Sequence, residues 1–203
     1  MKRCMTILAI LLLSAALGAI TDEEIEAAYH RSYDYEQVEN FEDAIRALLP
    51  VLEAYPRAYT INLRLGWLYY RNGKYANSIR HYDTAIQAAA ASLEAKLGRL
   101  LPLLAQERYA EVEKAAFDIL NVDYYNYFGN LRLCYALRMQ EKFDVAEKVS
   151  LKMLTVYPVD IAFLTEYALT KVGQGDMAAA LRVFANIRIL DPENPTAKQY
   201  LGL

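Results

Sequence analysis

The sequence predicts an all-α protein made of five similar helix pairs, each stacked on the next. Three observations support this class. Apolar residues recur at three- and four-residue spacing, which is typical of amphipathic helices. The same arrangement of aromatic and small residues returns every 34 residues between positions 25 and 194, with no insertion or deletion. Glycine or proline separates several of the apolar segments, as expected where helices end.

The stretch 59–92 shows this arrangement most clearly. Its first helix is expected to begin at Tyr59 and to stop at Asn72-Gly73, and its second to begin at Tyr75. Gly73 tolerates the positive φ that commonly ends a helix. A single helix pair of this size cannot bury both of its apolar faces, so it needs neighbours of the same kind.

A shift of the sequence by 34 residues supplies those neighbours. The positions of Tyr75, Ser78 and Ala85 are occupied by similar residues in most of the other units. The equivalent residues are Phe41, Tyr109, Phe143 and Met177; Ala44, Val112, Ala146 and Ala180; and Val51, Ile119, Met153 and Ile187. Three units close with proline, at Pro56, Pro158 and Pro192. We therefore expect repeats at 25–58, 59–92, 93–126, 127–160 and 161–194.

These positions resemble the tetratricopeptide repeat (TPR) family, whose pattern G-x-Y-x-x-A-x-x-x-Y-x-x-A is followed by proline. The pattern starts here at Gly73 and again at Gly175. The resemblance covers residues 25–194. It implies an all-α, right-handed superhelical solenoid of five helix-turn-helix repeats, and it implies protein binding rather than catalysis.

The third unit departs from the family pattern. Four units have a small residue where neighbouring helices cross: Ser32, Gly66, Cys134 and Ala168. The third unit has Leu100 instead. Pro102 also lies inside the expected first helix of this unit, where it removes a backbone hydrogen bond to the carbonyl of Gly98. We therefore expect a bend and a less regular stack at the third repeat.

Residues 1–19 have the features of a secretory signal peptide. Lys2 and Arg3 are followed by an apolar run and then by a cluster of small residues. The run is shorter than the roughly 20 residues that span a bilayer. Cleavage after Gly18 and cleavage after Ala19 both fit, and retention as a membrane anchor is the alternative. We expect export, into a bacterial periplasm, with membrane anchoring and full secretion as the other outcomes.

Removal of residues 1–19 leaves a TPR domain at 20–203 and takes the net charge from −3 to −5. This balance gives no reason to expect nucleic-acid binding. Thr21 and Glu24 have the spacing of a capping box at the first helix. At the other end, residues 195–203 resemble the opening of a sixth unit and form a partial cap. Because this cap is short, the last long helix should keep an apolar face partly exposed as a dimer or partner surface, at Leu181, Phe184 and Ile187.

Four aromatic residues join the third unit to the fourth: Tyr124, Tyr125, Tyr127 and Phe128. One interpretation is a binding edge. The other, which we favour here, is that the rings fill the wedge between neighbouring repeats.

No combination of residues points to catalysis, to a cofactor or to a metal. His30 and His81 lie in different units, without cysteine or acidic partners at ligand spacing. Both are expected to lie on the surface or in a groove. Cys134 has no second cysteine after residue 19 with which to form a disulfide, and it occupies a helix-crossing position. We expect it to be buried.

The resemblance also implies a concave groove lined by the first helix of each pair. The expected groove residues are Tyr29, Tyr33, Leu63, Trp67, Tyr70, Leu97, Leu101, Tyr135 and Arg138. TPR relatives that bind the acidic C-terminal tails of heat-shock chaperones have lysine and asparagine at such positions, so that carboxylate clamp is excluded by residue type. The surface here is aromatic at one end and aliphatic in the middle. It suits an apolar helix or extended peptide, unless a tight superhelix buries these residues against each other.

The sequence thus favours an exported adaptor or scaffold that holds a protein or peptide partner of unknown identity in this groove, without a cofactor. A glycan- or cell-wall-binding module is a second interpretation, because tyrosine rings can stack on sugars. A homo-oligomeric structural protein that uses its C-terminal face is a third. The leucines in the middle of the groove favour a peptide.

Overall fold

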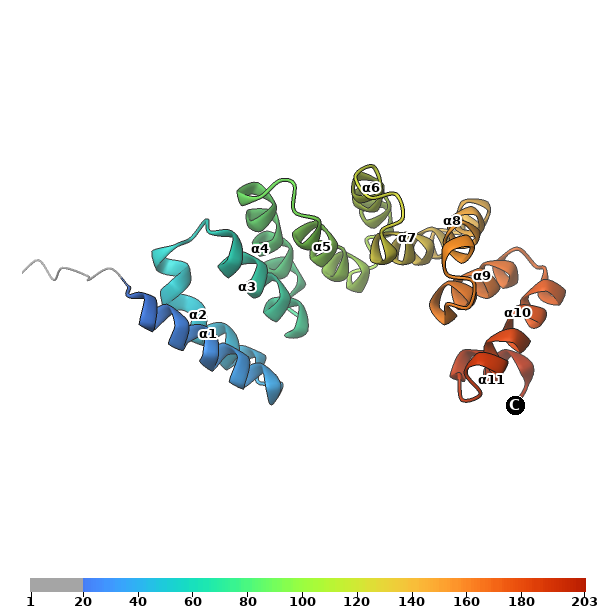
Figure 1. Cartoon of the computed structure of the whole chain (residues 1–203), viewed down its shortest axis with the longest axis horizontal. Helices are drawn as coiled ribbons and strands as arrows, with labels where there is room; N and C mark the ends of the chain where they lie inside the picture. Colours follow the sequence, from blue (N-terminus) through green and yellow to red (C-terminus); the bar gives the residue numbers. More distant parts are fainter. Residues whose placement is uncertain (1–19) are drawn as a thin grey trace, which may run out of the picture.

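The computed structural model describes residues 20–203, which form eleven α-helices and no strand. The first helices of the five pairs are α1 (Asp22–Gln37), α3 (Tyr59–Arg71), α5 (Leu93–Ala105), α7 (Tyr127–Met139) and α9 (Ile161–Gly173). The second helices are α2 (Phe41–Ala54), α4 (Tyr75–Ala88), α6 (Tyr109–Leu120), α8 (Phe143–Val156) and α10 (Met177–Leu190), and α11 (Pro195–Leu201) follows. The pairs form an elongated, curved row with α1 and α11 at opposite ends (Figure 1). The predicted all-α fold class is confirmed.

The predicted signal peptide lies outside the described residues. Within residues 20–203, no helix combines the length and the apolar character needed to cross a membrane.

The helix starts follow the 34-residue period. All five second helices begin at the repeat position of Tyr75, which is aromatic in four units and Met177 in the fifth, and α11 begins where a sixth first helix would start. Polar side chains cap many of these starts by accepting a hydrogen bond from a backbone N–H of the first turn. The caps are Asn40, Ser92, Asn126, Asp160, Asp176 and Asn194. Thr21 and Glu24 form the expected capping box.

In every unit, the turn between the two helices has a residue in the left-handed backbone conformation, and it lies at the same position of the repeat. Gly73 and Gly175 have φ values of 69° and 79°, and at the equivalent positions Glu39, Glu107 and Glu141 have φ values of 57°, 57° and 58°. Glycine adopts this conformation without a Cβ penalty, whereas glutamate does not. Three units therefore hold a strained turn that the repeat geometry imposes.

Consecutive helices approach closely where small residues face aromatic rings. The Tyr82 ring of α4 lies between α3 and α5, and it is 2% exposed. A Cβ atom added at Gly66 would lie 2.9 Å from this ring, and one added at Gly98 only 2.4 Å from it. Ser78 Oγ also donates a hydrogen bond of 2.6 Å to the carbonyl of Gly66. The second helix α4 therefore packs against both neighbouring first helices, α3 and α5.

The third repeat accommodates its large residues inside the core. Leu100 and Pro102 are buried. The helix α5 is 13 residues long, which is also the length of α3, α7 and α9. Leu100 belongs to one buried cluster with Val112, the largest residue at the position that is alanine or serine in the other units. Pro102 therefore does not shorten its helix, and the expected bend stays a prediction. Cys134 is buried, as expected.

The C-terminal helix α11 covers more of α10 than the sequence suggested. The expected exposure of Phe184 and Ile187 is wrong, because both are fully buried. The rings of Phe184 and Tyr200 stack with centroids 4.6 Å apart and planes 7° from parallel. Leu181 is partly buried, and the exposed large apolar residues of α10 are instead Met177, Ile189 and Leu190, at 44%, 78% and 44%.

The aromatic segment between the third and fourth repeats divides into two parts. Tyr127 fills the wedge, with its ring centroid 5.3 Å from that of Phe163, and its hydroxyl donates to Asp160. Tyr124, Tyr125 and Phe128 are 59%, 49% and 54% exposed. The expectation that all four rings fill the wedge is therefore wrong for these three. Only Tyr127, as the first residue of α7, is directed at α9.

His81 is buried, so its expected place on the surface or in a groove is wrong, whereas His30 is exposed. The Asn62 side-chain amide donates to the carbonyls of Pro56 and Ala58, at 3.0 and 2.8 Å. This leaves the Asn62 Oδ1 to accept, so His81 Nδ1, 2.9 Å away, is the protonated nitrogen. The ring of Tyr69 stacks on the imidazole with centroids 5.1 Å apart. Burial lowers the pKa of His81 to about 4.

Replacement of the strained glutamate at the turn should stabilise the protein. Glu141→Gly removes the Cβ penalty at φ 58° and should raise the free energy of unfolding by about 0.5–1 kcal/mol, partly offset by the greater chain entropy of glycine. Gly73→Ala should lower it by a similar amount. Urea denaturation at neutral pH measures both, and a stabilising Gly73→Ala would contradict the strained-turn account.

Acid should destabilise the fold through His81. Its ordinary pKa is 6.5 and its folded value is about 4, so between these pH values the unfolded chain binds a proton that the folded chain does not. The free energy of unfolding should therefore fall as pH decreases through this window, by about 3 kcal/mol. Denaturation curves of His81→Gln should show a shallower fall, while His30→Gln, at the exposed histidine, should match the wild type. Equal pH dependence of all three proteins would refute this assignment.

Candidate functional site

A hollow of about 560 Å³ lies on the face formed by the first helices. Four helices contribute to it: α3, α5, α7 and α9. We call this hollow the central groove and define it by its lining residues: Tyr70, Leu101, Leu104, Ala105, Leu131, Arg132, Tyr135, Ala162, Thr165 and Glu166. It brings together three of the nine site residues expected from the sequence, namely Tyr70, Leu101 and Tyr135.

The lining of the central groove combines leucines with two tyrosines, Tyr70 and Tyr135. Leu101, Leu104 and Leu131 are partly buried, and each leaves part of its surface accessible. The Tyr135 ring lies edge-on to that of Tyr109, with centroids 6.0 Å apart. The hydroxyl groups of tyrosine lining residues give polar tips above an apolar body. Such a surface can bury apolar side chains and still hydrogen-bond the backbone that connects them.

The other expected site residues lie beside the central groove or beyond it. The Leu97 carbonyl accepts a hydrogen bond from Arg132, and Arg138 forms an ion pair with the lining residue Glu166. At the N-terminal end, Trp67 Nε1 donates to Glu36, and Tyr33 lies under Arg64, whose Cζ is 3.9 Å from the ring centroid. Leu63 and Tyr29 are partly buried. The structure therefore uses Trp67 and Tyr33 partly in contacts between α1 and α3.

Two ion pairs connect neighbouring first helices at the same place in the repeat. Glu36 on α1 pairs with Arg64 on α3, and Arg138 on α7 pairs with Glu166 on α9. In each pair the partners are 28 residues apart, and all four side chains are at most 20% exposed. We call this place the inter-repeat position. In the first pair the acid lies on the earlier helix and the arginine on the later one, and in the second pair this order is reversed. The inter-repeat position therefore accepts an ion pair in either order.

The inter-repeat position has no ion pair in the middle of the row. Its occupants between α3 and α5 are Tyr70 and Gly98, and between α5 and α7 they are Leu104 and Arg132. Arg132 Nη1 donates to the carbonyl of Leu97 at 2.6 Å. Burial lowers the pKa of the Arg132 guanidinium, which nevertheless stays charged near neutral pH. The central groove thus holds one paired acid, Glu166, and one cation without a carboxylate partner among residues 20–203.

Sequence reasoning missed Arg132. It is equivalent to Arg64 when the sequence is shifted by two repeats, so the signal was present in the alignment of the units. Its significance depends on Leu104, which stands where Glu36 stands in the first unit. Only a comparison of partners 28 residues apart would have identified it.

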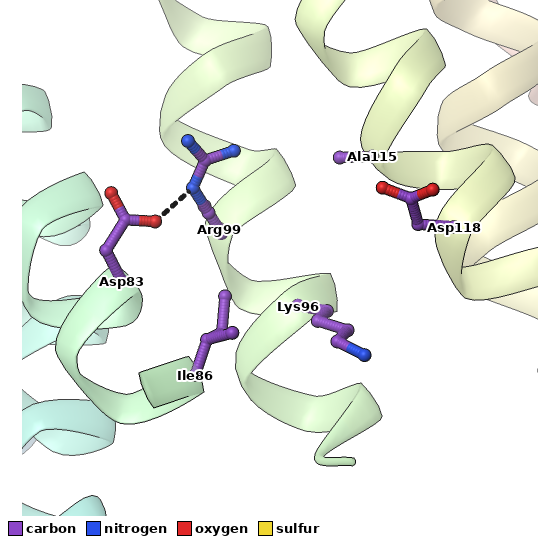
Figure 2. Close-up of a pocket in the computed structure, with 6 residues that line it drawn as sticks. All are labelled: Asp83, Ile86, Lys96, Arg99, Ala115 and Asp118. Atoms are coloured by element: carbon purple, nitrogen blue, oxygen red, sulfur yellow. Dashed lines mark hydrogen bonds and ion pairs between the residues drawn. The ribbon is translucent and has the colours of Figure 1, made fainter. Parts of the chain in front are cut away.

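A second, smaller hollow of about 200 Å³ lies between α4, α5 and α6 (Figure 2). It contains charges of both signs. Asp83 and Arg99 form an ion pair of 2.6 Å across it, and Lys96 and Asp118 also line it. Because these charges balance, the hollow favours neither anions nor cations. Within residues 20–203 no group of histidine, cysteine and acidic residues is arranged to hold a metal ion.

Comparisons with known proteins agree with this architecture. A family model described as "Tetratricopeptide repeat" matches residues 29–92 and 63–120. A comparison with curated protein sequences gave no match.

Several solved structures share the fold. A tetratricopeptide repeat protein from Parabacteroides merdae ATCC 43184 has a TM-score of 0.79 at 15% identity, over 88% of this chain and 71% of that one. MamA (residues 41 to the end) from Desulfovibrio magneticus RS-1 has a TM-score of 0.77 at 15% identity, over 87% and 99%. YrrB, described as a TPR protein with an unusual peptide-binding site, has a TM-score of 0.72 at 14% identity, over 90% and 94%.

The helix pairs, their 34-residue period and the matched family model agree: residues 29–120 match the tetratricopeptide repeat family, and the helix pairs that follow continue the same period in a fold shared with solved tetratricopeptide repeat structures.

Proposed function

We propose that this protein is a scaffold whose central groove binds a peptide segment of a partner protein. The main support is the groove itself, a hollow of about 560 Å³ that leucines and tyrosines from four helices line. Its volume suits a few large side chains of a helix or an extended strand. The groove lies on packed helices, so its shape is largely formed before a ligand arrives. The binding cost is then lower than for a disordered site.

A peptide suits this surface better than a sugar. Sugar sites commonly combine exposed rings with amide or carboxylate groups, whereas Leu101, Leu104 and Leu131 line the groove here. Glu166, the carboxylate in the groove, already accepts two hydrogen bonds from Arg138, at 2.8 and 3.2 Å. The similar fold of YrrB, which is described as having a peptide-binding site, adds support by analogy.

Selection from a library of random peptides displayed on phage, with the full-length protein as bait, tests the proposal. Trp67 is the sole tryptophan, and its ring centroid is 5.8 Å from that of the groove residue Tyr70, so its fluorescence can report binding. Leu101→Asn should weaken the selected peptides at least about tenfold, since it replaces apolar contact area by an amide. The matched control is Leu151→Asn, at an exposed leucine of α8 outside the groove.

Absence of any enriched peptide would overturn the proposal. Equal weakening by Leu101→Asn and Leu151→Asn would place the binding surface elsewhere. Circular dichroism and melting of each variant separate a loss of binding from a loss of folding.

We further propose that residues 1–19 direct export and are then removed. The support is their sequence pattern alone: a basic start, an apolar run and a cluster of small residues. Expression in a bacterium, followed by fractionation and intact-mass measurement, should give a periplasmic protein that begins at Ala19 or Ile20. Leu12→Arg, which interrupts the apolar run, should leave the uncleaved chain inside the cell. An uncleaved wild-type chain in the membrane fraction would instead support an anchor.

A further inference from the structure

The inter-repeat position offers an internal comparison for Arg132. Where an arginine occupies this position elsewhere, a carboxylate 28 residues away neutralises it: Glu36 for Arg64, and Glu166 for Arg138. For Arg132 the same spacing leads to Leu104, which cannot accept a hydrogen bond. Among residues 20–203, Arg132 takes part in no ion pair.

The surroundings of Arg132 do not replace the missing carboxylate. Its hydrogen-bond acceptor within residues 20–203 is the neutral carbonyl of Leu97, which occupies one of the five N–H groups of the guanidinium. The Phe128 ring lies with its centroid 5.4 Å from the guanidinium carbon, and burial lowers the pKa of Arg132. A partly buried cation with unused donors is costly unless an anion joins it. The groove therefore has a positive charge that an incoming ligand can neutralise.

We propose that Arg132 binds a carboxylate side chain of the peptide, an aspartate or a glutamate that lies between apolar residues. This inference rests on the proposed function of the central groove and specifies its ligand. The apolar neighbours of the acid would contact Leu101, Leu104 and Tyr135, which line the same hollow. Arginine offers two parallel N–H groups to a carboxylate, so a single acid can be held in a defined orientation.

A single negative charge suits the groove better than a phosphate group does. Glu166 lines the groove as well, and its carboxylate is already neutralised by Arg138. A dianionic phosphate would find one arginine without a carboxylate partner and would bring its second negative charge close to the carboxylate of Glu166. The structure thus favours an acidic peptide with one central carboxylate over a phosphopeptide.

The test uses the full-length protein and the peptides obtained by selection on it. An enriched peptide is synthesised with its central acid, with that acid changed to its amide, and with phosphoserine in its place. Arg132→Met should weaken the acidic peptide about tenfold to a hundredfold and should leave the amide version unchanged. The control is Arg80→Met, at an exposed arginine of α4 outside the groove, which should not affect either peptide.

A second variant gives Arg132 a carboxylate partner within the protein itself. Leu104→Glu places a carboxylate at the inter-repeat position, as Glu36 is placed beside Arg64. It should abolish the preference for the acidic peptide over its amide version, and it should not lower the melting temperature. Because Arg132→Met removes a partly buried charge without a carboxylate partner, its melting temperature should not fall either.

The outcomes separate the two proposals. If enriched peptides lack acids, or bind Arg132→Met as tightly as the wild type, the carboxylate inference fails while the peptide-binding groove stands. Tighter binding of the phosphoserine peptide than of the acidic one also overturns it. If no peptide is enriched at all, both proposals fail.

Discussion

The structure depends on contacts between neighbouring repeats, because no helix pair can bury its own apolar faces. The Tyr82 ring shows this directly. It lies on α4 and is 2% exposed, because α3 packs against it at Gly66 and α5 packs against it at Gly98. The same ring therefore joins the second repeat to the third. Stability in such an array is a sum of local interfaces, so the helices must be held in the correct order before a groove can exist across them.

The sequence predicted the fold well because its information is local and repeated. Aromatic residues such as Tyr75 and Phe143 mark helix starts, and Gly73 marks a turn. The errors concerned burial, which depends on a neighbouring element. Phe184 is covered by the ring of Tyr200 on a helix that looked too short to matter. In such cases the residue's own pattern contains no information about what lies over it.

The candidate site was only partly predictable for the same reason. Tyr70, Leu101 and Tyr135 were identified because the repeat pattern places them on one face, and the structure brings them into one hollow. Arg132 was missed because its importance lies in a partner that is absent, at Leu104. Trp67 also differs from expectation in detail, since its indole is held by Glu36 of the preceding repeat. Which hydrogen bonds and ion pairs a groove residue can form with a ligand depends on those that it already forms with neighbouring residues.

The exchanged charges at the inter-repeat position also bear on how the array assembles. Repeats of one architecture can stack in the wrong order during folding, which is a common failure of repeat proteins. With the first helix α1 placed against α9, Glu36 would face Glu166; with α7 placed against α3, Arg138 would face Arg64. Both mistakes bring like charges together at a partly buried site, where repulsion is strong. The two ion pairs therefore favour the correct order of the repeats, because each of these two wrong arrangements places like charges at the inter-repeat position.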